Sequence, residues 1–310
     1  MEPHTTSTLH HLRAWHDGAV LQPDLAAPIA IIQIGIDPVF FHIHWYGLMY
    51  AVAFVTAFRY GVVAHLSRYG IDRALMERVT GWTILFGLIG ARLYYVVQSD
   101  LAYYLQNPVH IFAVWEGGMA FFGAIGASSL TLFVLSRRWG FSFWMALDAG
   151  AFFATIGQPI GRIGNVINGD ILGPPSTAPW AMAYTNPHAI LQPGFALCVP
   201  ASCTAYQPAA VYEAIGTLII LGLLLLLRRL HVAVGAIGIS YVALYAVSQL
   251  VIFHWRAAMP TYHGLAQAQW TAVATLLIAV PALLLLWNAS GRGRAVVPVD
   301  SPRSQPILGP

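Results

Sequence analysis

Seven long apolar stretches constrain this chain more than any other feature of its sequence. Each holds about 20 mainly apolar residues, the length of helix that crosses the hydrocarbon core of a bilayer. The stretches cover residues 44–66, 79–97, 118–136, 143–162, 208–227, 235–254 and 269–288. Only 9% of the 310 residues are charged, whereas a soluble domain carries about 25%, so disorder, a coiled coil and most soluble enzymes are excluded. The sequence predicts an all-α integral membrane protein with seven transmembrane helices.

The arginines predict how these helices are oriented. Ten of them lie in the loops after the first, third and fifth stretches or beyond the seventh, whereas Arg13 and Arg256 fall on the opposite side. Cytoplasmic segments carry the excess of positive charge. The N-terminus is therefore expected outside the cytoplasm and the C-terminus inside it. The ten arginines are Arg68, Arg73, Arg78, Arg137, Arg138, Arg228, Arg229, Arg292, Arg294 and Arg303.

The segments around the spans follow from this orientation. Residues 1–43 are expected outside the cytoplasm or at the membrane interface, and they contain no signal-peptide core. The membrane domain covers residues 44–288, with extracytoplasmic loops at 98–117 and 165–207. Residues 289–310 are rich in Pro, Ser, Gly and Arg, which predicts a disordered cytoplasmic tail. The net charge of +3 gives no reason to expect nucleic acid as a partner.

Ionisable side chains within or beside the spans are costly and mark candidate functional sites. Asp148 lies near the cytoplasmic start of the fourth span. The others are expected near the extracytoplasmic ends of several spans, where they would meet at one membrane depth and form a site for a lipid headgroup. These other side chains are His44, Arg92, Glu116, Arg162, Asp170 and Glu213.

The polar run at 157–170 is the richest of these places. Gly161 and Gly164 allow a neighbouring helix to approach closely, and Pro159 is expected to loosen the helix so that backbone groups become available to a ligand. Arg162 carries a fixed fork of donors that matches phosphate oxygens and stays charged in an apolar setting. The run therefore predicts a phosphate site.

Three polar side chains follow this arginine and admit two interpretations. Asn165, Asn168 and Asp170 would orient Arg162 or bind the hydroxyls of a headgroup. Alternatively, Arg162 forms a structural salt bridge with Asp170 or Glu213 that only closes the bundle. The sequence alone leaves both interpretations open.

The two cysteines, Cys198 and Cys203, lie in the second extracytoplasmic loop. Either a small disulfide or a free pair fits their spacing and location. The chain has no cysteine–histidine spacing typical of a metal site, no HExxH motif and no GxSxG motif. The sequence therefore predicts no metal.

Five segments carry a family resemblance: His44–Tyr50, Gly90–Tyr95, Trp115–Met119, Gly161–Asp170 and Tyr212–Glu213. Together they resemble the prolipoprotein diacylglyceryl transferases, in matching order over about residues 30–290. The resemblance implies transfer of a diacylglyceryl group from phosphatidylglycerol to the lipobox cysteine thiol of a preprolipoprotein, with release of glycerol phosphate. It implies no cofactor and a multi-pass location in the bacterial plasma (inner) membrane. The implied partners are phosphatidylglycerol, preprolipoprotein signal peptides with a lipobox cysteine, and membrane lipids; the oligomeric state is not predicted.

The resemblance also implies roles for individual residues. Arg162 would hold the phosphate, and His44, Tyr46, Tyr212 and Glu213 are the candidates for steering the thiol proton. A thiol is already a few per cent ionised near neutral pH, so a strong base is helpful but not essential. The residues implied in substrate binding are Arg92, Glu116, Asn165, Asn168, Asp170, Glu213 and Arg256.

Several positions depart from the family's pattern. Phe122 and Gln207 stand where many members have histidine, Gln249 and Phe253 where an arginine and a glutamate are usual, and Asp170 where the signature usually ends in glutamate. A mechanism that uses a histidine at 122 as base is therefore excluded. These losses motivate an alternative hypothesis, a non-catalytic paralogue that binds lipid or lipoprotein signal peptides. A small-solute transporter is a third hypothesis, although the halves show no internal repeat.

Overall fold

The structure is a computed structural model that describes residues 32–34, 39–40, 43–99, 101–113, 118–191, 194–200, 202–256, 261–262 and 264–291. Several predictions fall outside these residues: the tail beyond 291, most of the segment 1–43, and Glu116. The side chains of His44 and Phe122 are also outside the description, although their backbones are placed.

Each of the seven apolar stretches lies on a long helix, so the prediction of a mostly helical membrane protein is confirmed. Among the described residues, five helices are long and apolar enough to cross a membrane: Trp45–Tyr69, Arg73–Val97, Ala209–Arg229, Ala236–Trp255 and Ala268–Asn288. The first is built from α2 (Trp45–Thr56), a π-helical turn η1 (Ala57–Val63), α3 (Ala64–Leu66) and a 3-10 turn η2 (Ser67–Tyr69). The other four lie on α4 (Arg73–Gln98), α9 (Ala209–Arg229), α10 (Ala236–Ile252) with the turn that follows it, and α11 (Gln267–Gly291). Two more long helices, α7 (Phe121–Trp139) and α8 (Phe143–Asn168), carry the remaining two apolar stretches.

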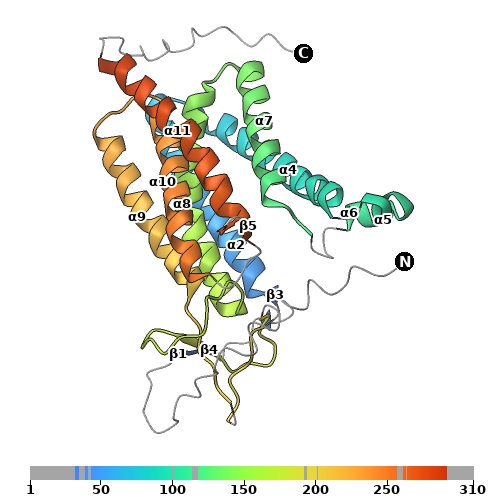
Figure 1. The fold of residues 1–310 in the computed structure, drawn as a ribbon. Helices are drawn as coiled ribbons and strands as arrows, with labels where there is room; N and C mark the ends of the chain where they lie inside the picture. The colour runs from blue at the N-terminus through green and yellow to red at the C-terminus, as the bar shows by residue number, and fades with distance from the viewer. Residues whose placement is uncertain are drawn as a thin grey trace.

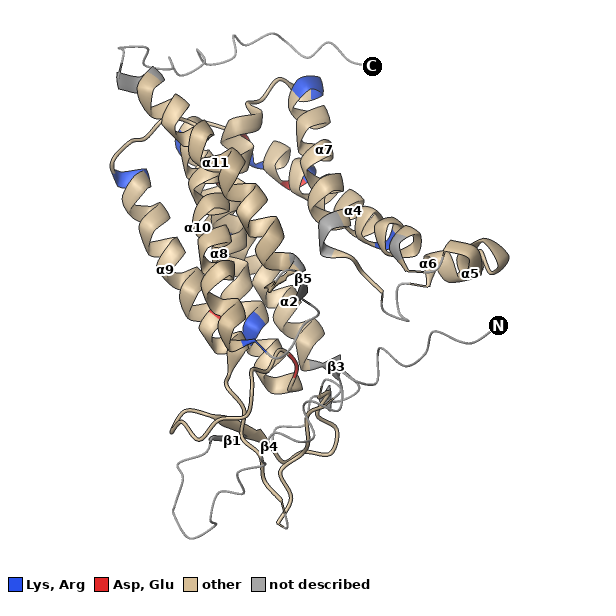
Figure 2. Ribbon diagram, viewed as in Figure 1, with Lys and Arg blue, Asp and Glu red and all other residues tan. Residues whose placement is uncertain are grey.

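The long helices divide into a bundle and a separate pair. Figure 1 shows α2, α8, α9, α10 and α11 side by side, while α4 and α7 lean away from them. The far end of α4 lies near the short helices α5 (Leu101–Gln106) and α6 (Val109–Phe112). The pair is held together where two glycines bring the backbones into contact. A Cβ atom on Gly90 would lie only 2.7 Å from the carbonyl oxygen of Gly123. The last turns of α7 and α9 both contain arginines, and these turns lie at the same end of the molecule (Figure 2).

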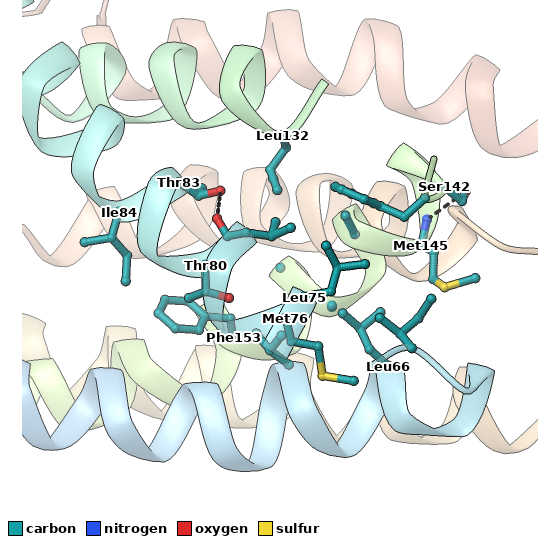
Figure 3. Close-up of a pocket in the computed structure, with 17 residues that line it drawn as sticks. Leu66, Leu75, Met76, Thr80, Thr83, Ile84, Leu132, Ser142, Met145 and Phe153 are labelled. Carbon is teal, nitrogen blue, oxygen red and sulfur yellow. Dashed lines mark hydrogen bonds between the residues drawn. The ribbon is translucent and has the colours of Figure 1, made fainter. Parts of the chain in front are cut away.

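A cavity of about 710 Å³, counted with its open side, lies where the α4–α7 pair meets the bundle (Figure 3). Its walls are apolar, with Leu66, Met76, Leu132 and Phe153 among the residues that line it. The Thr83 hydroxyl in its wall donates to the carbonyl of Val79 at 2.7 Å. Because no charged side chain is among the residues that line it, the cavity offers little to recognise a phosphate group.

Helix α8 corrects the prediction for the fourth span. The loop was expected to begin at 165, but α8 continues through a buried Pro159 to Asn168. The polar residues remain helical because they find partners inside the protein: the Asn165 side chain bonds to both Arg162 and Asp170. The helix ends at Gly169, whose φ of 87° is the left-handed conformation that favours glycine at a helix C-terminus.

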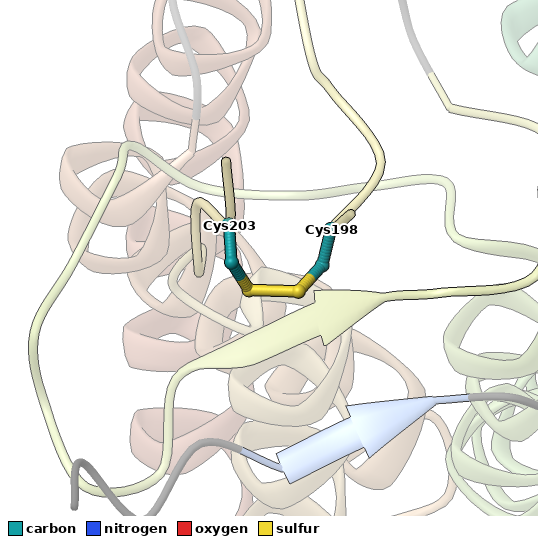
Figure 4. Close-up of a disulfide and its surroundings, with 2 residues drawn as sticks. All are labelled: Cys198 and Cys203. Atoms are coloured by element: carbon teal, nitrogen blue, oxygen red, sulfur yellow. A yellow bond between two sulfur atoms is a disulfide. The ribbon is translucent and has the colours of Figure 1, made fainter. Parts of the chain in front are cut away.

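The loop after α8 folds into a cap at one end of the bundle (Figure 1). Its strand β4 (Met182–Tyr184) pairs in parallel with β1 (Ile32–Ile34). The Tyr184 hydroxyl donates to the carbonyl of Val166 at 2.8 Å, which fixes the cap to α8. Cys198 and Cys203 form a disulfide (Figure 4), which settles the choice that the sequence left open. Two further hairpins join β2 (Val39–Phe40) to β3 (Ile43–His44) and β5 (Thr261–Tyr262) to β6 (Leu265–Ala266).

Candidate functional site

Two arginines from different elements converge on one buried carboxylate. Arg162 on α8 forms an ion pair with Glu213 on α9. Arg256 Nη1 lies 3.4 Å from Glu213 Oε1. The glutamate is only 3% exposed. Isolated buried charges are unfavourable, so this pairing explains why all three groups tolerate the location.

Arg256 lies just beyond the predicted span 235–254, after a change in the backbone. α10 ends at Ile252, and a 3-10 turn, η4 (Phe253–Trp255), follows. Arg256 then has extended backbone angles (φ −98°, ψ 138°). This change of direction is what brings its side chain back to Glu213.

A hydrogen-bonded relay extends the cluster towards the cap. Arg162 Nη1 donates to Asn165 Oδ1 at 3.1 Å, and Asn165 Nδ2 donates to Asp170 Oδ2 at 2.7 Å. Asp170 therefore reaches Arg162 through Asn165. Burial raises the pKa of the Asp170 carboxyl, while the bond from Asn165 and the charge of Arg162 act in the opposite direction.

Two buried oxygens in this region, Asn168 Oδ1 and Asp170 Oδ1, have no hydrogen-bond partner among the described residues. Glu213 Oε1 meets only the ion-pair contact from Arg256 at 3.4 Å. More than about 90% of buried polar groups in proteins are hydrogen-bonded, and an exception calls for an explanation. The cluster thus offers two guanidinium groups and a set of unused acceptors, which suits an anion that also carries hydroxyls.

Tyr46 lies beside this cluster. Its hydroxyl donates to that of Tyr50 at 2.9 Å, and it interacts electrostatically with Asp170 and Arg162. The tyrosine comes close because α2 packs on Gly164, where a Cβ atom would be 3.2 Å from the Tyr46 Cα. The structure therefore brings together Arg162, Asn165, Asp170, Glu213, Arg256 and Tyr46.

Tyr212 points into a different network, although it precedes Glu213. Its hydroxyl accepts from Trp180 Nε1 at 2.7 Å and donates to Gln207 Oε1. Gln207 Nε2 in turn donates to Ser176 Oγ at 2.6 Å. Tyr212 thus connects α9 to the cap, and its catalytic role stays a prediction.

Arg92 lies within the α4–α7 pair and is buried. Its guanidinium donates to the carbonyls of His110, Ile111 and Gly118 at 2.5, 3.0 and 3.0 Å. These bonds hold α6 and the segment before α7 against α4. The expectation that Arg92 binds substrate is untested, whereas its contacts show that it organises this part of the chain.

Tyr245 on α10 is a member of the cluster that the sequence interpretation missed. It interacts electrostatically with Glu213, Arg162 and Arg256. Its only sequence signal is its position four residues before Gln249, which is a buried amide within an apolar helix. Among the described residues, no group of three His, Cys, Asp or Glu side chains is placed to hold a metal.

Comparison with known proteins agrees with this geometry. The sequence profile of the prolipoprotein diacylglyceryl transferases matches residues 32–287. A phosphatidylglycerol–prolipoprotein diacylglyceryl transferase of Frankia alni is 33% identical over 270 residues, which cover 85% of this chain and 67% of the relative. Another, from Halalkalibacterium halodurans, is 30% identical over 277 residues, covering 88% and 90%. With a match of this extent and an arginine cluster on the family's signature segment, the chain belongs to the prolipoprotein diacylglyceryl transferase family.

Proposed function

We propose that this protein transfers the diacylglyceryl group of phosphatidylglycerol to the lipobox cysteine thiol of preprolipoproteins. The observation that carries the proposal is the convergence of Arg162 and Arg256 on Glu213. A lone structural salt bridge would need one arginine for one carboxylate. Two forked cations beside unused acceptors instead fit a phosphate that carries a hydroxylated headgroup.

The reaction places its charge where these arginines lie. The cysteine sulfur attacks the diacylglyceryl carbon that bears the phosphate, a carbon–sulfur bond forms, and the carbon–oxygen bond to phosphate breaks. The phosphodiester carries one negative charge, and the departing glycerol phosphate develops a second. Arg162 and Arg256 would stabilise this added charge, which is the kind of interaction that accelerates a reaction because it is strongest in the transition state.

Glu213 has a separate task in this account. Without lipid it keeps the two guanidinium groups together and compensates their charge, and the arriving phosphate then shares them. Asn165 holds Arg162 in place, and the unused oxygens of Asn168 and Asp170 would accept from the headgroup hydroxyls. Tyr46 is the best-placed of the described candidates for steering the thiol proton, because its hydroxyl lies beside this cluster.

We also propose how the helices are oriented in the membrane. All seven helices would cross the bacterial plasma membrane, with the N-terminus and the cap outside the cytoplasm and the C-terminus inside. Two features support this orientation: arginines gather at the opposite end from the cap, and the cap contains a disulfide, which persists in oxidising compartments. The lipobox cysteine of the signal peptide would then meet the lipid at the cap end.

The purified full chain, a lipobox peptide and labelled phosphatidylglycerol test this function. The expected result is label on the peptide thiol and none on a peptide with serine in place of the cysteine. Lipid binding without transfer would contradict the proposal and support the non-catalytic alternative, which the names of the relatives do not favour.

A second lipid tests the headgroup contacts. Phosphatidylpropanol keeps the phosphodiester but lacks both hydroxyls, so it cannot satisfy the acceptors of Asn168 and Asp170. Each lost hydrogen bond is worth about 1 kcal/mol, which predicts transfer about tenfold slower or more than from phosphatidylglycerol. Equal rates for the two lipids would contradict hydroxyl recognition and leave the transferase activity standing.

A further inference from the structure

The peptide unit between Trp255 and Arg256 is held in two places by residues outside α10. Gly173 in the cap packs directly on it, because a Cβ atom on this glycine would clash with the carbonyl oxygen of Trp255. The ring of Tyr212 on α9 meets the Trp255 ring edge-on, with centroids 6.2 Å apart. Arg256 extends from this peptide unit to Glu213. Its contact with the carboxylate therefore depends on where the cap and α9 hold Trp255.

Gly173 is itself fixed to the segment that leads into α9. Its backbone N–H donates to the carbonyl of Gln207 at 2.7 Å, and the N–H of Gln207 donates to the carbonyl of Pro174 at 3.0 Å. A Cβ atom on Gly173 would also lie only 2.7 Å from the Cβ of Gln207. The preceding residue, Leu172, is buried in the apolar core of the cap. No side chain fits between Gln207 and Trp255, so the close approach of the two backbones requires glycine.

The chain makes a strained turn just before this glycine. Ile171 has a φ of 61°, in the left-handed region where a β-branched residue is a genuine outlier. It follows Asp170 of the candidate site, and its carbonyl accepts from the N–H of Ala210 at 3.3 Å. Strained backbone persists only where the surrounding structure holds it, and it gathers at functional sites. The strain therefore points to a functional reason for the path of residues 170–173.

Tyr212 is joined to Gly173 through one residue. The Tyr212 hydroxyl accepts from Trp180 Nε1 and donates to the side-chain oxygen of Gln207. The backbone carbonyl of Gln207 accepts from the N–H of Gly173. The two contacts on Trp255 are thus parts of one connected unit, which can fix both the ring and the carbonyl of this residue.

We propose that Gly173 and Tyr212 are positioning residues for the transfer reaction, and that they place Arg256 at the phosphate of phosphatidylglycerol. The inference rests on the proposed function, in which Arg256 stabilises the charge on the departing glycerol phosphate. Neither positioning residue touches the lipid. The competing explanation is that they only fasten the cap to the bundle, in which case their loss harms the fold without acting through Arg256.

A double-mutant cycle between Gly173→Ala and Arg256→Gln in the purified full chain tests the proposal, with rates expressed per folded molecule. The added methyl group must move the Trp255–Arg256 peptide unit, so Gly173→Ala is expected to slow transfer about tenfold. It should also raise the KM for phosphatidylglycerol, because the phosphodiester is charged before the reaction begins. The double variant should be no more than about twofold slower than Arg256→Gln alone, since no guanidinium is left to position. A purely structural role predicts that the two losses multiply and that the KM of Gly173→Ala is unchanged.

Tyr212→Phe is the milder variant, and it keeps the proposal testable if Gly173→Ala does not fold. It keeps the ring beside Trp255 and removes the hydroxyl that anchors this ring to the cap. We expect transfer about threefold slower, because one neutral hydrogen-bonded anchor is lost, and no further loss in the Arg256→Gln background. The matched control is Gly222→Ala on α9, where an added Cβ would lie in open space; its transfer rate should not change.

Three results would overturn the proposal: losses that multiply in both cycles, normal transfer by Arg256→Gln, or a loss in Gly222→Ala as large as that in Gly173→Ala. Each of them leaves transfer by the unmodified chain, and hence the proposed function, intact. Lipid binding without transfer by the unmodified chain would instead refute the proposed function. The same cycles are then measured as the Kd for phosphatidylglycerol, where losses that do not multiply support the positioning of Arg256 and losses that multiply refute it.

Discussion

A buried carboxylate lies near each end of α8, and the two carboxylates have different hydrogen-bond partners. At one end Asp148, 1% exposed, accepts from the backbone N–H of Gly235 at 2.8 Å and of Gly238 at 2.7 Å. Both of its oxygens are thus occupied, and they satisfy amides at the start of α10 that a helix leaves unpaired. At the other end Asp170 keeps an oxygen without a hydrogen-bond donor, and Oε1 of Glu213 is met only by Arg256 at 3.4 Å.

This difference separates structure from function better than burial or charge does. All intramembrane charges are costly and invite a functional interpretation. A carboxylate whose bonds are complete within the protein, such as Asp148, has nothing left to offer a ligand. A cluster with surplus donors on Arg162 and Arg256 and surplus acceptors on Asn168 and Asp170 is incomplete until something binds.

The largest predicted effect is that of Glu213→Ala. Two guanidinium groups would lose their carboxylate, and breaking a buried pair in this way costs about 3–5 kcal/mol. We expect a marked drop in melting temperature in detergent and little transfer. Phosphatidylglycerol should restore part of the melting temperature, because its phosphate replaces the missing charge. If the lipid gives no more stabilisation than phosphatidylcholine, the cluster is not a phosphate site.

Asp148→Ala comes next, because its effect is expected on stability alone and not on transfer. It removes two hydrogen bonds to a charged group, each worth about 1.5–3 kcal/mol, and leaves the amides of Gly235 and Gly238 unpaired. The melting temperature should fall, phosphatidylglycerol should not restore it, and the transfer rate per folded molecule should stay near that of the unmodified protein. A selective loss of transfer rate in a folded Asp148→Asn variant would show that Asp148 takes part in transfer, and would contradict the contrast drawn between the two ends of α8.

The smallest effect is expected for Asp170→Asn, and it depends on pH. Burial holds the pKa of Asp170 above its unfolded value, which is about 3.9. The unfolded chain therefore ionises first, so this group lowers stability as the pH rises from about 4 to the folded pKa, and the loss is constant above that. Asparagine removes the charge and can still accept from Asn165. The difference in melting temperature between the two proteins should grow in favour of Asp170→Asn over that window. A difference that is flat with pH, or of opposite sign, would contradict the burial of an ionisable carboxyl here.

The sequence predicted the helices well because span length and apolarity are local properties. It misjudged where α8 ends because a polar run after an apolar stretch resembles a loop. Arg162, to which Asn165 offers an acceptor, meets its own partner Glu213 only in the folded bundle. The signature pointed to Arg162, and its meeting with Glu213 was one of the open alternatives. The arrival of Arg256 depends on a turn at Phe253–Trp255 that no periodicity shows.

The roles of Tyr46 and Tyr212 also could not be predicted from the sequence. Both lie in matched motifs, and nothing in the sequence separates them. The Tyr46 hydroxyl donates to Tyr50 while its ring packs on Gly164 of the signature segment. The Tyr212 hydroxyl bonds to Trp180 and Gln207, because the cap packs over the start of α9. The motifs therefore indicated which segments form the site, and only the tertiary contacts show which of their side chains lie in it.

The central claim is that Arg162 acts through its forked hydrogen bonds to phosphate and not only through its charge. The most direct test measures melting temperature and transfer rate on the same preparations of the unmodified protein, Arg162→Lys and Arg162→Ala. Lysine keeps the charge but loses the planar fork. Losing one charge-assisted bond, worth about 1.5–3 kcal/mol, predicts that Arg162→Lys folds normally and is slowed about tenfold to a hundredfold, with Arg162→Ala slower still. Near-normal turnover in Arg162→Lys, together with a loss of stability confined to Arg162→Ala, would contradict the account and leave Arg162 as a structural salt bridge.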